Sequence, residues 1–303
     1  MQCNQRSSTL WTAEAPAKIN LFFEVLGQRD DGFHNIVSIA LPIQLFDTLA
    51  FELTDTPGIP FKCVGNKDIP LDETNLAVRA VKLLQQRYHV PYGASLTLTK
   101  RIPSQSGLGG GSSDAAAALR LACRAWNLDV PEPELMTLAS ELGSDCPLFF
   151  FDGPTIGTGR GEQIQPLSDT VLSGRAALWF VLLKPPEGLS TPAVYAECMP
   201  IHDGQFRQSD DLIKAIETGN VHAIGQHLFN RLEHPAQKLW TRFGEFKPFL
   251  LSLGCLAVQM SGSGTAFFGM CENEEHAREV FESLCRKAAP EHKPFLVRSC
   301  CGH

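Results

Sequence analysis

The stretch of the chain best suited to chemistry is a glycine-rich loop, Pro103-Ser-Gln-Ser-Gly-Leu-Gly-Gly-Gly-Ser-Ser-Asp114. It follows Ser95-Leu-Thr-Leu-Thr99, which alternates polar and apolar residues as a half-buried strand does, and it precedes an alanine-rich run that is typical of a helix. Glycine lets a ligand approach the main chain closely, and Ser112, Ser113 and Asp114 are residue types that cap helix N-termini. The order strand, loop and helix N-terminus therefore predicts a phosphate site built from backbone N–H groups.

Three common motifs do not fit this loop. A P-loop needs a lysine after its last glycine, and none follows here. A dinucleotide-binding fingerprint, G-x-G-x-x-G, fails because its last position falls on Ser112 or Asp114. A nucleophile elbow, G-x-S-x-G, fails because no candidate serine has glycine at both flanking positions; the candidates are Ser112, Ser113, Ser261 and Ser263. A flexible structural turn remains the alternative to a phosphate loop.

Two charged residues, Lys18 and Asp145, stand next to strongly apolar stretches. Lys18 lies in residues 15–28, where alternating apolar residues from Ile19 to Val25 predict a strand, and it shares one face of that strand with Asn20. Asp145 stands in the polar turn Gly143-Ser-Asp-Cys-Pro147, just before an apolar run. From the residues alone, a solvated lysine and a turn aspartate are the better interpretations.

The rest of the chain alternates predicted strands and helices, and its length of 303 residues favours two domains. A glycine-rich stretch at 153–161 marks the expected boundary, which divides the chain into residues 1–160 and 161–303. Periodicity predicts strands at residues 35–43, 47–53, 61–64, 95–99, 176–183 and 295–298, a strand–turn–strand at 258–269, a short helix from Ser190, and helices at 75–87, 112–126, 131–142, 210–217, 220–233, 235–252 and 274–287.

Composition limits the partners and the compartment. A net charge of −7 argues against nucleic acid, whose binding needs clustered lysine and arginine. No stretch approaches the roughly 18 apolar residues that span a membrane, and the first residues do not resemble a signal peptide. The ten cysteines are scattered without metal-ligand spacing, as reduced thiols are. We expect a cytoplasmic protein that binds no nucleic acid and is a monomer or weak homodimer.

Three separated motifs together resemble those of the GHMP kinases, the family of galactose, homoserine, mevalonate and phosphomevalonate kinases. Their order and spacing fit across nearly the whole chain: Ala15-Pro-Ala-Lys-Ile-Asn-Leu21, Gly107-Leu-Gly-Gly-Gly-Ser-Ser-Asp-Ala-Ala116 and Ser261-Gly-Ser-Gly-Thr265. Further stretches are similar to the branch that phosphorylates 4-diphosphocytidyl-2-C-methyl-D-erythritol: Gly27-Gln-Arg-Asp-Asp-Gly-Phe-His34, Leu142-Gly-Ser-Asp-Cys-Pro147, and Thr191-Pro192 with Tyr195.

The resemblance implies both a fold and a reaction. The fold is a two-domain α+β fold, with a left-handed βαβ crossover in the N-terminal domain and a ferredoxin-like C-terminal domain. The reaction is transfer of the γ-phosphoryl group of ATP, with Mg²⁺, to the C2 hydroxyl of that cytidine diphosphate derivative, a step of the non-mevalonate isoprenoid pathway. Such a transfer depends on positioning and on neutralising charge.

The resemblance also implies residue roles. Asp145 matches the catalytic aspartate that accepts the proton of the substrate hydroxyl, and Lys18 matches the lysine that orients it. Ser112 or Ser113 contacts the phosphate or the metal, and Ser113 is the candidate metal ligand. The ATP-binding positions are Pro103, Ser106, Gly107, Leu108, Gly109, Gly110, Gly111, Ser112 and Ser113. The substrate positions are Asn20, Phe33, His34, Tyr195, Ser261, Gly262, Ser263 and Gly264, with two aromatic faces around the base and His34 at its edge.

Two departures from the family pattern concern fine contacts. Phe33 stands where tyrosine is usual, so the stacking face is kept and the phenol hydroxyl is lost. Ser104-Gln105-Ser106 replaces a smaller, more glycine-rich lead-in to the loop. Two other interpretations stay open: another GHMP kinase, for homoserine or mevalonate, and a relative without activity that binds a metabolite.

Overall fold

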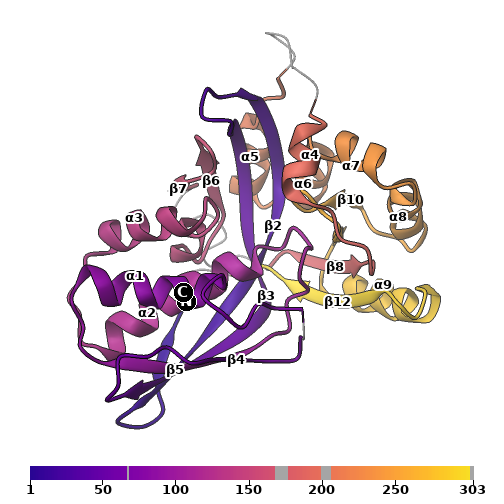
Figure 1. Ribbon diagram of the computed structural model, residues 1–303. Coiled ribbons are helices and arrows are strands. Elements are labelled where there is room, and N and C mark those ends of the chain that lie inside the picture. Colours follow the sequence, from indigo (N-terminus) through magenta and orange to yellow (C-terminus); the bar gives the residue numbers. More distant parts are fainter. Residues whose placement is uncertain (67, 168–176, 199–205, 301–303) are drawn as a thin grey trace. The chain divides into compact units, whose positions relative to one another are not determined.

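The computed structural model describes residues 1–66, 68–167, 177–198 and 206–300, which form two compact units (Figure 1). Unit 1 contains Met1–Ala17, Leu45–Ser104 and Gly109–Phe151, and unit 2 contains Lys18–Gln44, Gln105–Leu108 and Asp152–His303. Two long strands, β2 (Leu10–Gln28) and β3 (His34–Thr54), each contribute one half to either unit. The units interleave segments of chain, and the boundary expected near residue 160 stays a prediction.

Unit 1 is built on a sheet with the strand order β1-β2-β3-β5-β4, in which β1 (Cys3–Gln5) and β4 (Phe61–Val64) are the edges. Strand β5 (Gly93–Thr99) lies between β3 and the edge strand β4, and it pairs antiparallel with β3 and parallel with β4. Helix α1 (Leu76–Arg87) joins the two parallel strands, so β4-α1-β5 is a βαβ unit.

The helices of unit 1 position the glycine loop. Helix α2 (Gly110–Ala125) lies beside α1, and its alanines at 115–118 are fully buried, so the two helices can pack closely (Figure 1). Helix α3 (Glu132–Leu142) packs against both and is followed by the 3₁₀ turn η1 (Pro147–Phe150). The N-cap of α2 is Gly109, in the left-handed region at φ 71°, and no side chain caps the helix. The expectation that a serine or aspartate caps α2 was therefore wrong, because Ser112, Ser113 and Asp114 lie within its first turns.

Unit 2 contains a four-stranded antiparallel sheet, in the order β10-β11-β8-β12. Its strands are β8 (Trp179–Lys184), β10 (Ala257–Met260), β11 (Phe267–Cys271) and β12 (Lys293–Arg298). Helices precede β10 and separate β11 from β12, which gives the ferredoxin-like arrangement. Helix α8 (Phe243–Ser252) packs on β10 and β11, and α9 (Glu274–Lys287) packs on β8, β11 and β12. The core between them is aromatic: Phe246 stacks on Trp240 at 4.8 Å and on Phe267 at 5.3 Å between ring centroids.

Other segments of unit 2 pair with the second half of β2 and the first half of β3, which belong to this unit. The hairpin of β6 (Thr155–Thr158) and β7 (Gln163–Pro166) pairs with β3, and the two-residue strand β9 (Phe229–Asn230) pairs parallel with β2. The remaining helices are α4 (Thr191–Ala196), α5 (Asp210–Thr218), α6 (Val221–His227) and α7 (Glu233–Leu239). In the part of the chain that the structure describes, no helix is long and apolar enough to cross a membrane.

Three sequence-based expectations about these elements were wrong. The helix expected at 235–252 is two helices, α7 and α8, because Trp240 leaves the helical region at φ −133°. Strands expected at 35–43 and 47–53 are one strand, β3, which runs without a break through the more exposed residues 44–46, where the apolar alternation is lost. The helix expected at 220–233 ends at His227, since Leu228 leaves the helical region at ψ 135° and β9 follows.

Candidate active site

A buried polar group in unit 2 brings together stretches that are far apart in the sequence. Lys18, on β2, is only 3% exposed, and its Nζ donates to Asn20 Oδ1 at 2.5 Å. Asn20 Nδ2 donates to Ser38 Oγ at 2.8 Å, and the Asn20 N–H donates to Ser261 Oγ at 3.3 Å. Because a buried charge is costly unless polar groups surround it, this arrangement contradicts a solvated Lys18. The buried lysine is instead oriented by the residues around it.

The turn after β10 meets the start of the glycine loop inside the same unit. Ser261 Oγ donates to the carbonyl oxygen of Gly107 at 2.9 Å, and the Lys18 N–H donates to the carbonyl oxygen of Leu108 at 2.9 Å. A Cβ on Gly262 would lie 3.3 Å from both Lys18 Nζ and Asn20 Oδ1. The glycine at 262 thus leaves room beside the ammonium group. Four predicted site residues, Lys18, Asn20, Gly107 and Ser261, are in contact.

The conformation of this turn is held by a residue that the sequence did not reveal. Asn230, on β9, is buried, and its Nδ2 donates to the carbonyl oxygens of Met260 at 2.9 Å and Gly262 at 2.8 Å. Its Oδ1 accepts from the Leu232 N–H at 2.9 Å. Ser263 Oγ is 2.8 Å from Thr191 Oγ1 at the start of α4. Nothing in the local pattern distinguishes Asn230 from an ordinary capping asparagine.

Aromatic and basic side chains of unit 2 gather around the predicted base site. The rings of His34 and Tyr195 lie 5.1 Å apart and are tilted by 34°. The Phe33 side chain is 50% exposed, and the guanidinium of Arg160, from the β6–β7 turn, lies 4.8 Å from the centre of its ring. Partial burial lowers the pKa of His34 below its ordinary value of 6.5, so the imidazole is neutral at pH 7. Arg160 was not among the residues expected from the sequence.

The rest of the glycine loop belongs to unit 1, where it becomes the N-terminus of α2. Gly109 is in the left-handed region, Gly110 and Gly111 form the first turn, and the N-cap residue makes no side-chain hydrogen bond to the N–H groups of this turn. Ser113 Oγ is buried and finds no hydrogen-bond partner among the described residues. An orphaned buried hydroxyl at an uncapped helix N-terminus fits an external ligand such as a phosphate or its metal ion.

Asp145 lies in the turn between α3 and η1 of unit 1 and is partly buried. The next residue, Cys146, is hydrogen-bonded to the side chain of Ser112. Burial raises the pKa of the Cys146 thiol to about 12, so this cysteine is not a nucleophile at neutral pH. The contact places the turn that carries Asp145 against the first turn of α2.

A buried charged network, which the sequence did not reveal, lies under the loop. Lys100 Nζ donates to Asp47 Oδ2 at 2.5 Å and to Asp114 Oδ2 at 2.7 Å, and these side chains are 4%, 0% and 4% exposed. Burial raises the pKa of Asp114 to about 7, against the opposing effect of the Lys100 ammonium. Burial acts to lower the pKa of Lys100, but Asp114 and Asp47 together raise it above its ordinary value. A lysine directly after a strand is usually exposed to solvent, so the sequence pattern did not indicate that Lys100 is buried in an ion pair.

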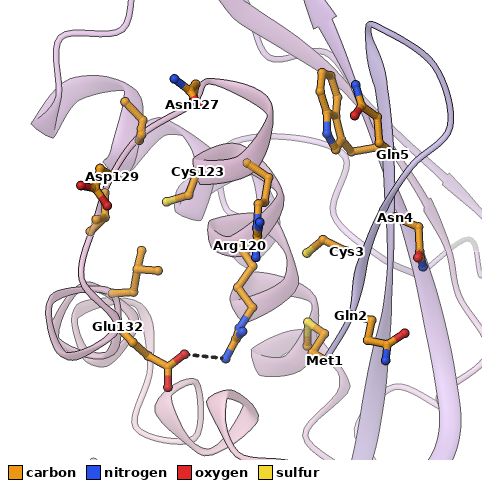
Figure 2. A pocket seen from close by; sticks show the side chains of 15 residues that line it. Met1, Gln2, Cys3, Asn4, Gln5, Arg120, Cys123, Asn127, Asp129 and Glu132 are labelled. Carbon is orange, nitrogen blue, oxygen red and sulfur yellow. Dashed lines mark hydrogen bonds and ion pairs between the residues drawn. The ribbon is translucent and has the colours of Figure 1, made fainter.

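Unit 1 also has a hollow that contains none of the predicted site residues. It lies between β1, the second half of α2 and the segment that precedes α3 (Figure 2). The Arg120 side chain points into this hollow, and its Nη2 donates a hydrogen bond to Glu132 Oε2 at 3.1 Å. Among the described residues, no group of three or more histidine, cysteine, aspartate or glutamate side chains could hold a metal ion.

Comparison with known proteins shows the family of the chain. The model of the GHMP kinases N terminal domain matches residues 75–153, and that of the GHMP kinases C terminal matches residues 212–290. A 4-diphosphocytidyl-2-C-methyl-D-erythritol kinase from Shouchella clausii is 36% identical over 274 residues, 90% of either chain. The chain belongs to the GHMP kinase family. A second such kinase, from Pelotomaculum thermopropionicum, is 38% identical over 269 residues, 89% of this chain and 92% of its own.

Solved structures of this GHMP kinase's relatives confirm the fold. A crystal structure of 4-(cytidine 5'-diphospho)-2C-methyl-D-erythritol kinase has a TM-score of 0.80 at 32% identity, covering 96% of this chain and 100% of its own. Homoserine kinase from Cytophaga hutchinsonii has a TM-score of 0.75 at 17% identity, covering 100% and 98%. The two-domain α+β GHMP kinase fold and the small-molecule kinase class, both predicted from the sequence, are confirmed. The residue roles stay predictions.

Proposed function

We propose that this GHMP kinase transfers the γ-phosphoryl group of ATP to the C2 hydroxyl of 4-diphosphocytidyl-2-C-methyl-D-erythritol. The observation that carries the proposal is the contact of Lys18, Asn20, Gly107 and Ser261, which joins the three family motifs around a buried ammonium group. The identity of the substrate is supported by relatives of that name at 36% and 38% identity.

The chemistry is divided between a base and a cation. Asp145 accepts the proton of the substrate hydroxyl, because an alcohol is a poor nucleophile until it loses that proton. Lys18 stabilises the negative charge that develops on the oxygen, and its hydrogen bond to Asn20 fixes where the charge of Lys18 lies. The left-handed glycines at 107 and 109 support main-chain binding of the phosphates by Ser106 to Ser113.

The unpartnered hydroxyl of Ser113 supports it as the ligand of Mg²⁺ or of a phosphate oxygen. When bound, Mg²⁺ supplies neutralising charge between the phosphates. His34, Tyr195 and Phe33 bind the cytosine ring, with the neutral imidazole at the edge of the base. The cytoplasmic location and the expected state of a monomer or weak homodimer stay predictions of the sequence.

The test is an ADP-release assay with three acceptors. We expect turnover with 4-diphosphocytidyl-2-C-methyl-D-erythritol and none with mevalonate or homoserine. Release of ADP only with mevalonate or homoserine would sink the assignment. Release with none of the three, from a folded protein that binds ATP, would favour a metabolite-binding relative.

The role of Asp145 is tested with Asp145→Asn. We expect kcat to fall on the order of 10²–10⁴-fold, as general-base removal does, while the Kd of ATP stays within about twofold. Asp129→Asn, at an exposed aspartate of the same unit, is the matched control and should leave kcat unchanged. A loss of ATP affinity equal to the loss of rate would show that Asp145 binds nucleotide instead.

A further inference from the structure

We propose that Asp47 and Lys100 are positioning residues that hold the two ends of the phosphate-binding loop together, so that its main-chain N–H groups are preformed for ATP. The inference rests on the proposed function, since it requires that the loop binds ATP. Asp47 comes from β3, Lys100 follows β5, and their partner Asp114 comes from α2, so the network joins the strand that enters the loop to the helix that leaves it.

At the entry of the loop, Asp47 acts on the main chain. Its Oδ1 accepts from the N–H groups of Arg101 at 2.6 Å and Ile102 at 2.9 Å, the two peptide units before Pro103. Its Oδ2 accepts from Lys100 Nζ at 2.5 Å. Asp47 is fully buried, so water cannot replace these bonds. The carboxylate therefore fixes the direction in which the chain leaves β5.

At the exit of the loop, Lys100 acts on α2. Its Nζ donates to Asp114 Oδ2 at 2.7 Å, and a Cβ on Gly110 would lie 2.8 Å from the same Nζ. The first residue of α2 thus rests on the ammonium group, and only glycine allows that approach. Lys100 binds Asp47 and Asp114 at once. The position of each end of the loop is therefore fixed by the same buried atom, Lys100 Nζ.

The two carboxylates differ in a way that makes the proposal testable. Both oxygens of Asp47 receive hydrogen bonds, so an asparagine there must turn its NH₂ group toward a donor, either Lys100 or the backbone of 101–102. Asp114 Oδ2 accepts from Lys100 and Asp114 also interacts with the Asp47 carboxylate, whereas its Oδ1 has no hydrogen-bond partner among the described residues. An asparagine at 114 can point its NH₂ group that way and keep the bond to Lys100. The same chemical change should therefore break the network at 47 and spare it at 114.

The experiment compares Asp47→Asn with Asp114→Asn, measuring the Kd of ATP and the Kd of the cytidine substrate by calorimetry on protein shown to be folded by its denaturation curve. We expect Asp47→Asn to raise the Kd of ATP roughly 10–100-fold, because a lost buried acceptor leaves a donor unsatisfied. Asp114→Asn should stay within about threefold. The Kd of the cytidine substrate, whose predicted residues belong to unit 2, should be unchanged in both.

A second variant keeps the proposal open to refutation if Asp47→Asn does not fold. Lys100→Arg conserves every charge but puts a larger group against Gly110, and we expect it to raise the Kd of ATP about 3–10-fold. ATP affinity within twofold of the wild type in folded Asp47→Asn, or in Lys100→Arg where the former does not fold, would overturn the inference. So would an equal loss of affinity for both ligands, which is the mark of general destabilisation. A wild-type protein that binds no ATP would instead refute the proposed function itself.

Discussion

Gly107 is the position at which the geometry of the loop can be tested most directly. An ideal Cβ on Gly107 would lie 1.9 Å from the carbonyl oxygen of Ser261, whereas ordinary contact begins at 3.4 Å, so the two segments would have to separate by about 1.5 Å. The obstacle is backbone, which cannot rotate away as the end of a side chain does. Gly107 is also at φ 73°, where a side chain costs roughly 1–2 kcal/mol.

We therefore expect Gly107→Ala to lower kcat/KM for ATP on the order of 10²-fold, the loss that a displacement of about 1 Å causes in a positioned site. Overpacking should also reduce the free energy of unfolding by about 1–3 kcal/mol. The assay is coupled ADP release with ATP varied at saturating acceptor, together with urea denaturation. Such a shift would also disturb the hydrogen bond from Ser261 Oγ to the Gly107 carbonyl.

Gly153→Ala is the matched control, because Gly153 belongs to the same unit, has no positive φ, and has no atom within 4 Å of an added Cβ. Its kinetics and stability should match those of the wild type. If Gly107→Ala binds and uses ATP as Gly153→Ala does, to within twofold, the close approach of the loop to Ser261 does not position the phosphates.

Two further predictions concern the base site. Arg160→Ala should raise the KM of the cytidine substrate roughly 2–5-fold, the value of a cation–π contact of about 0.5–1 kcal/mol, and leave the KM of ATP unchanged. The control is Arg29→Ala, which removes an arginine that is paired with Asp31. If both variants raise the KM of the cytidine substrate equally, the contact between Arg160 and Phe33 does not contribute to substrate binding. For His34, burial lowers the pKa, so the KM of the cytidine substrate should be constant at pH 7–8 and rise as the pH falls below 6.5, where the imidazole gains a proton. His34→Gln should abolish that rise in a pH series, and a rise that persists in this variant would assign it to another group.

Much of the fold follows from local patterns in the sequence. Helix α9 has the bounds that its amphipathic pattern predicts. Helix α1 was predicted to begin at Asn75, which is its capping residue, and it begins one residue later. The strand β5 was found from four alternations, although it starts two residues earlier. These elements are predictable because one buried face and one terminal residue specify each of them.

The contacts between distant segments were not predictable in the same way. Asp47, Lys100 and Asp114 are separated by 53 and 14 residues, and each has an ordinary local interpretation, as a strand residue, a solvated lysine or a cap. Asn230 likewise gave no sign that it holds the turn at Met260 and Gly262. Lys18 and Ser261 entered the site only through the family resemblance, because periodicity does not say which strands meet.

The same separation in sequence has a consequence for synthesis on the ribosome. The hydrogen bond from the Asn20 N–H to Ser261 Oγ joins residues 241 positions apart. The parallel pairing of β2 with β9 likewise cannot form until Phe229 has been synthesised. At about 5–20 residues per second, the apolar strand β2 emerges roughly 10–50 s before the turn at 261. During that interval Phe23 and Val25 of β2 lack the residues of the C-terminal third with which they form a core cluster. Nascent chains of this protein should therefore depend on holding chaperones, and fast translation of the last hundred codons should raise the yield of folded enzyme.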